Sequence, residues 1–80
     1  MESILDIRQM VYIIKIKIKD KDFFLTDLKK SLSNNFKDSM IFLDKNTAEH
    51  IIGDLETTFE SKTGYLISCK LLTVPIFILF

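Results

Sequence analysis

The segment Met10–Lys19 reads MVYIIKIKIK, and its second half alternates strictly between isoleucine and lysine. An apolar residue at every second position is typical of a β-strand with one buried face, because successive side chains of a strand point to opposite sides. The isoleucine side needs an apolar cover, whereas the lysine side needs water or an anion. The segment therefore predicts a strand. What the lysine side of this strand contacts is then the main question about function.

Length and composition favour one small folded domain over residues 1–80. The 80 residues are 48% hydrophobic and include seven Phe and two Tyr, which is typical of a packed globule. Residues 1–9 are expected to form an arm that is flexible or docks on the core. A short chain with this much apolar surface is also expected to self-associate, as a homodimer first or as a higher homo-oligomer.

The charge balance argues against bulk attraction to nucleic acid or to an anionic membrane, since 11 basic and 11 acidic residues cancel. A single cysteine excludes an internal disulfide, so a cytoplasmic location is expected. The N-terminus lacks the pattern of a signal peptide, and no apolar run approaches the ~20 residues that cross a bilayer. Lysine almost replaces arginine, which, with abundant Ile and Phe, hints at an AT-rich genome such as that of a low-GC bacterium, its phages or some eukaryotic viruses.

A first helix is predicted from Asp22 to about Asn34. Asp22 suits the N-cap, and the apolar residues that follow it have helical spacing. Asn34 and Asn35 suit a helix end, because Asn tolerates left-handed backbone. The apolar residues of this predicted helix are Phe24, Leu25, Leu28 and Leu32.

A short inner strand, Ser39–Asp44, is expected next, followed by the clearest helix of the chain. Asn46 and Glu49 resemble a capping box, although Thr47 is an equally good cap. Lys62 and Gly64 suit the C-terminal end of this helix, and mid-helix Gly53 suggests a close packing contact. The apolar stripe of the helix is Ala48, Ile51, Ile52, Leu55 and Phe59.

The segment Tyr65–Val74 predicts a long strand, and Pro75 marks an edge or a bend, because proline donates no ladder hydrogen bond. Strands alternating with helices predict an α/β fold, with α+β as the alternative. The expected architecture is a two-layer sandwich in the order β-α-β-α-β(-β), in which two helices cover one face of a mostly parallel or mixed sheet of three or four strands.

Lysines at alternate positions suggest a nucleic-acid surface, because cations on an open sheet face bind phosphates. A solvated or edge strand guarded by lysines explains the same pattern, and no aromatic residue interleaves them. The candidate residues are Lys15, Lys17, Lys19 and Lys70.

Acidic residues on the second predicted helix suggest docking on a basic protein partner, although they also suit the solvated side of any amphipathic helix. The candidates are Glu49, Asp54, Glu56 and Glu60.

The C-terminal run has two interpretations. It is either a buried last strand or an exposed strand that pairs with a second copy or a target. The residues of this candidate oligomer strand are Val74, Ile76, Phe77, Ile78 and Phe80.

Catalytic chemistry is not indicated. His50 and Asp54 supply two potential metal ligands without a third, and Cys69 lies among apolar neighbours where a thiol is normally inert. No metal, cofactor or enzymatic activity is therefore expected. The favoured function is a small non-catalytic protein-binding module, of the kind that phages and viruses encode as accessory or inhibitor proteins to dock on a larger host complex. The alternative is a nucleic-acid-binding domain that uses the lysine-lined face.

Overall fold

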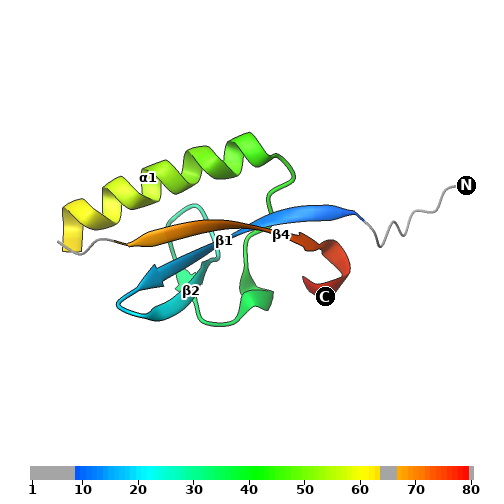
Figure 1. Ribbon diagram of the computed structural model, residues 1–80, viewed down its shortest axis with the longest axis horizontal. Coiled ribbons are helices and arrows are strands. Elements are labelled where there is room, and N and C mark those ends of the chain that lie inside the picture. Colours follow the sequence, from blue (N-terminus) through cyan, green and yellow to red (C-terminus); the bar gives the residue numbers. More distant parts are fainter. Residues whose placement is uncertain (1–8, 64–66, 80) are drawn as a thin grey trace, which may run out of the picture.

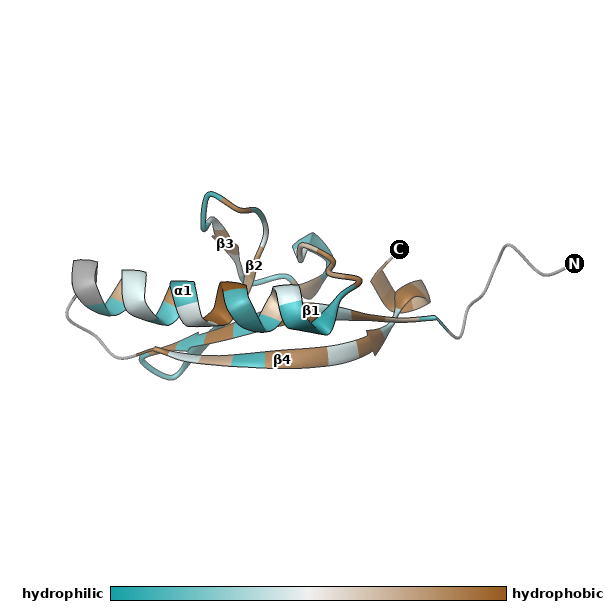
Figure 2. Ribbon diagram, turned by 90° about the horizontal axis from the view of Figure 1, so that it is seen from above, coloured by the Kyte–Doolittle hydropathy of each residue, from teal (hydrophilic) through white to brown (hydrophobic). Residues whose placement is uncertain are grey.

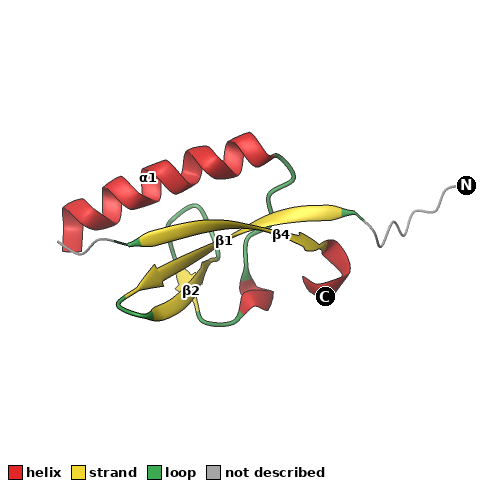
Figure 3. Cartoon of the chain, in the orientation of Figure 1, coloured by secondary structure: helices red, strands yellow, loops and turns green. Residues whose placement is uncertain are grey.

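The computed structural model describes residues 9–63 and 67–79, without the side chains of residues 61–63. The described chain forms an antiparallel four-stranded sheet in the order β3-β2-β1-β4, with one long helix across one face (Figures 1 and 3). The elements are β1 (Met10–Ile18), β2 (Lys21–Leu25), β3 (Leu32–Ser33), the 3-10 helix η1 (Phe36–Asp38), α1 (Lys45–Thr63), β4 (Ser68–Pro75) and the 3-10 helix η2 (Ile76–Leu79).

The fold is therefore a small α+β domain, and the expected parallel or mixed sheet with two covering helices is wrong. The difference begins at the turn after β1. Lys19 and Asp20 both have positive φ, 49° and 70°, and Ile18 pairs with Lys21 across them. A two-residue turn of this kind matches the right-handed twist of a hairpin, so the chain returns directly as an antiparallel strand.

The predicted helix from Asp22 to Asn34 is replaced by β2, a loop and β3. Phe23 and Leu25 point to the α1 side of the sheet and Phe24 to the other side, as their pairing with β1 requires. Leu25 is buried in the first face, and Phe24 is half-buried beside the apolar cluster on the second face, so successive apolar residues suit a strand here. Leu28, which completes the apparent helical stripe, is 62% exposed.

The loop between β2 and β3 is organised by Asp27. Its carboxylate accepts hydrogen bonds from the backbone N–H groups of Lys29 and Ser31, at 2.9 and 3.2 Å. Lys30 adopts positive φ in the same loop. Asn35, predicted as a helix end, instead caps the start of η1 by accepting a hydrogen bond from the Lys37 N–H.

The predicted strand Ser39–Asp44 is reduced to one β-bridge. Phe42 exchanges two backbone hydrogen bonds of 2.8 Å with Tyr12, and the Met40 N–H donates to the Leu25 carbonyl. The bridge lies beside the first half of β1, whereas β2 pairs with the second half. Buried Phe42 anchors the connection that leads to α1.

The N-cap of α1 is Asp44, not Asn46 or Thr47. Its carboxylate accepts hydrogen bonds from the Thr47 N–H at 3.2 Å, the Thr47 hydroxyl at 2.7 Å and the Asn46 N–H at 3.4 Å. These bonds, led by the Thr47 hydroxyl, lower the pKa of Asp44 below its usual value. The Lys62 side chain and Gly64, both predicted to end this helix, lie outside the described part of the structure.

Two apolar clusters lie on opposite faces of β1. The α1 face joins Ile14 and Ile16 to Leu55 of the helix. The other face joins Val11 and Ile13 to Leu79 of η2, which Figure 2 shows beside the end of β4. The predicted apolar stripe of α1 is thus confirmed as core, with Ala48 and Leu55 fully buried and Ile51, Ile52 and Phe59 packed around them.

The expected last strand is partly wrong. β4 runs from Ser68 to Pro75, but Ile76–Leu79 turn into η2 and fold back over the second cluster. Of the candidate oligomer strand, Val74 lies in β4, Ile76, Phe77 and Ile78 lie in η2, and Phe80 lies outside the described residues. Within the described ranges, no helix is long and apolar enough to span a membrane.

Candidate binding surfaces

Two polar surfaces stand out, one on each face of the sheet. The first, which we call the lysine hollow, lies on the face opposite α1. It is a small depression of about 40 Å³ lined by Lys15, Lys17, Asp22, Ser68 and Lys70.

Strand register places the lining residues of the lysine hollow. Lys15 lies directly opposite Lys70 across β1 and β4. Lys17 lies opposite Ser68 on one side and Asp22 on the other. The structure therefore brings together three of the four lysines that the sequence suggested, while Lys19 occupies the hairpin turn and does not line the hollow.

The sequence pattern does not identify Asp22 as a member of this surface, because it predicts a helix N-cap at this residue. Its carboxylate lies 3.5 Å from the Lys15 ammonium, and both side chains are partly exposed. The signal that identifies it is the two-residue turn at Lys19–Asp20, since pairing Ile18 with Lys21 puts Asp22 beside Lys17.

The second surface combines the outer edge of β4 with acidic residues of α1. β4 ends the sheet, and no strand of the described chain pairs with its outer side. Glu49, Glu56 and Glu60 are exposed on α1. At about 100° per residue they lie within roughly 40° of one another around the helix. We call these three glutamates the acidic row.

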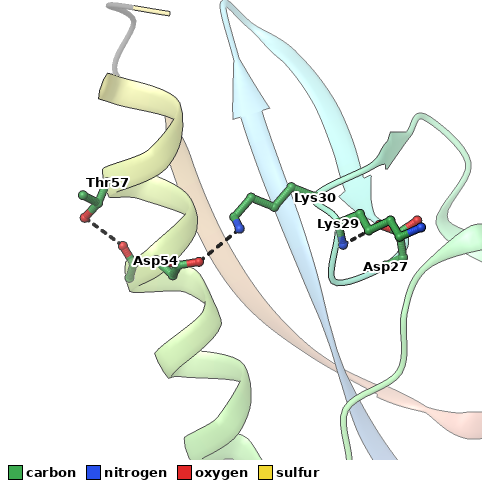
Figure 4. Close-up of polar contacts among 6 residues, drawn as sticks. Asp27, Lys29, Lys30, Asp54 and Thr57 are labelled. Carbon is green, nitrogen blue, oxygen red and sulfur yellow. Dashed lines mark hydrogen bonds and ion pairs between the residues drawn. The ribbon is translucent and has the colours of Figure 1, made fainter. Parts of the chain in front are cut away.

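The acidic row lies on the β4 side of α1. Burial chiefly, and secondly the negative charge of Glu56, raise the pKa of the Cys69 thiol in β4 to about 11. Leu55 packs into the core, and the acidic row lies on the flank of α1 away from the β2–β3 loop, which is the β4 side of the sheet. Asp54 lies about 140° around the helix from Glu49 and pairs with Lys30 of the β2–β3 loop at 3.3 Å (Figure 4). The four predicted acidic residues thus divide into the acidic row and a structural ion pair.

The remaining candidates for chemistry are not brought together. His50 is exposed on the outer side of α1, whereas Cys69 packs against the core beneath the helix. A thiol whose pKa is about 11 stays protonated near neutral pH and is a poor nucleophile. Among the described side chains, no group of three His, Cys, Asp or Glu residues is placed to hold a metal ion.

Comparison of the chain with protein-family models, with curated proteins and with solved structures finds no match.

Proposed function

We propose that this protein is a non-catalytic protein-binding module that receives an extended segment of its partner along the outer edge of β4. The observation that carries the proposal is that no strand among the described residues pairs with this edge. A strand edge offers a row of backbone N–H and C=O groups that another strand satisfies by adding to the sheet. Such a module would serve as an accessory or inhibitor protein on a larger complex.

β4 suits this role better than the opposite edge of the sheet. It is eight residues long, whereas β3 at the other end has only two. Its apolar residues Leu71, Leu72 and Val74 are only partly buried, so an added strand would cover them further. Of the usual devices that protect an edge, β4 has a lysine, Lys70, and a proline at its last position.

Charge decides which kind of strand fits. A second copy, paired antiparallel through β4, would bring the two α1 helices side by side, at roughly the 8–10 Å of packed helices, because neighbouring strands lie only about 4.8 Å apart. The two acidic rows, three glutamates on each, would then face each other, which disfavours self-pairing. A partner strand with Lys or Arg on its α1 side would instead neutralise Glu49, Glu56 and Glu60.

The test uses two synthetic peptides of equal length, one alternating lysine with valine and one alternating glutamate with valine. At physiological ionic strength, the lysine peptide should bind and slow hydrogen exchange of β4 backbone amides, measured by NMR. The glutamate peptide should leave the amides unchanged. Reversing the charge of the acidic row, with Glu49→Lys, Glu56→Lys and Glu60→Lys combined, should invert this preference.

The matched control is Asp20→Lys, which reverses an exposed acidic residue in the hairpin turn and should keep the preference for the lysine peptide. Binding that shifts α1 resonances without protecting β4 would contradict strand addition. A stable dimer in light scattering whose β4 amides are protected would show that the occupant is a second copy, and would overturn the proposed partner.

A further inference from the structure

The lysine hollow places like charges together without full compensation. Lys15 and Lys70 are direct cross-strand neighbours, an arrangement that destabilises a sheet when both side chains carry the same charge. Lys17 follows Lys15 on the same face of β1, and Asp22 supplies the single counter-charge of the hollow. Three ammonium groups and one carboxylate leave a local charge of +2 in a chain whose net charge is zero.

The composition of the chain does not require these lysines to lie close together. A surface lysine gains most by standing apart from other lysines, and an acidic residue in place of Lys70 would neutralise Lys15 across the strands. The sheet instead concentrates positive charge around one depression. An anion seated there would relieve the repulsion between Lys15 and Lys70 and would gain charge-assisted hydrogen bonds.

We propose that the lysine hollow binds one doubly charged tetrahedral oxyanion, that is, a phosphate ion or a terminal phosphoryl group. The ammonium groups of Lys15, Lys17 and Lys70 supply the charge, and the Ser68 hydroxyl supplies a neutral donor. This site lies on the opposite face of the sheet from the acidic row, although Ser68 and Lys70 belong to β4, the strand whose outer edge is proposed above to bind a partner.

The size of the hollow favours a single phosphoryl group over a nucleic-acid backbone. A water molecule needs roughly 10–15 Å³ of such space, so about 40 Å³ admits a compact group of a few atoms. Backbone tracking requires a basic groove several nucleotides long, whereas Lys19 lies outside the lining. A backbone phosphodiester also carries one negative charge, half of what the hollow would neutralise.

Asp22 tunes the affinity. Its carboxylate competes with the anion for Lys15, to which it is bound at 3.5 Å. Asp22→Asn raises the local charge from +2 to +3 and should tighten phosphate binding. If the Asp22 carboxylate merely held the lysines in place, its replacement would instead weaken phosphate binding.

The experiment follows backbone amides of the hollow residues by NMR during titration with inorganic phosphate, with sodium chloride at matched ionic strength as reference. We expect saturable shifts at Lys15, Lys17, Ser68 and Lys70 that chloride does not reproduce. A small phosphomonoester and a single-stranded oligonucleotide form two further arms. The phosphomonoester should bind like phosphate, and the oligonucleotide should bind more weakly per phosphate.

The decisive variant is Lys70→Gln, which should weaken phosphate binding about ten-fold or more by removing one charged donor. It should also raise the thermal midpoint of the free protein, because the cross-strand repulsion with Lys15 is lost. This rise would verify that the variant folds. Lys37→Gln, an exposed lysine in η1, is the matched control and should leave binding unchanged.

Three results would overturn the proposal: shifts that chloride reproduces, equal loss of binding in Lys37→Gln and Lys70→Gln, or tight oligonucleotide binding without saturable phosphate binding. The last result would assign the surface to nucleic acid.

Discussion

Gly53 occupies the exposed side of α1, and beyond the adjoining residues and backbone of the helix itself a Cβ placed there would meet no atom within 4 Å. The sequence suggested a close contact at this glycine, and the open space around it shows that expectation to be wrong. Glycine in a helix then brings only its entropic cost. The Gly53 carbonyl accepts a hydrogen bond from the Thr57 hydroxyl, which any residue at position 53 would retain.

Gly53→Ala should therefore raise the free energy of unfolding by about 1 kcal/mol, because alanine has the better helix propensity and meets no obstruction. Urea denaturation followed by circular dichroism measures the change. Ala48→Gly on the buried side of the same helix should lower stability. An unchanged or reduced stability of Gly53→Ala would mean that something packs on this side of α1.

Cys69 makes stability depend on pH in the alkaline range. The pKa of its thiol is raised to about 11 in the folded chain, against an ordinary value of about 8.5 to 9. The folded state therefore keeps a proton that the unfolded state has lost. The contribution is complete below about pH 8.5 and is lost as pH rises toward 11.

Cys69→Ala should accordingly flatten the fall of stability between about pH 8.5 and 10 relative to the parent. Denaturation midpoints measured at several pH values test this, and the common titration of lysines and tyrosines cancels in the difference. Glu56→Gln should have a smaller effect in the same direction, since the charge of Glu56 is the lesser cause of the shift. Parallel curves for parent and Cys69→Ala would contradict the assignment.

Among the elements, the β1–β2 hairpin decides the topology. Its turn uses Lys19 and Asp20 in left-handed backbone, which is unfavourable for residues other than glycine and, to a lesser degree, asparagine and aspartate. The sequence predicted a helix that begins at Asp22, directly after this turn. A two-residue turn leads into an antiparallel strand, and this choice removes the first predicted helix.

Asp20→Gly should raise the free energy of unfolding by up to about 1 kcal/mol, because glycine adopts positive φ without a Cβ clash. Lys21→Gly, the next residue but within β2, should lower stability, since glycine weakens a strand. Chemical denaturation of both variants makes the comparison. Destabilisation by Asp20→Gly equal to that of Lys21→Gly would place position 20 in the strand and contradict the turn.

For the molecule as a whole, the sheet is covered differently along its length. α1 covers one face, and η2 covers the other face only at the end where β1 begins and β4 finishes. The lysine hollow lies on a part of that second face that η2 does not cover. Ile13 and Ile14 are adjacent in β1 and point to opposite faces, yet both are almost completely buried.

Ile13→Val and Ile14→Val should each cost about 1 kcal/mol, because each deletes a methylene from a packed cluster. Ile41→Val, at a position 36% exposed, should cost clearly less. Equilibrium unfolding in urea measures all three. If Ile13→Val behaved like Ile41→Val, the second face of β1 would be open to solvent and η2 would not cover it.

The sequence alone determined β1 and the two orientations of its side chains, the apolar stripe of α1 and most of β4. It also identified the lysines at positions 15, 17 and 70 as members of one candidate surface. These features arise from periods of two and 3.6 residues, which are local properties of the chain. Tertiary structure alone decided the antiparallel order, the replacement of a helix by β2, the bridge at Phe42 and the turn of Ile76–Leu79 into η2. It also decided that Asp22 joins the lysines and that β4 lies at the end of the described sheet. Pairing between strands joins residues far apart in sequence, and the cover on each face of a strand comes from elsewhere in the chain, so no local pattern specifies either of them.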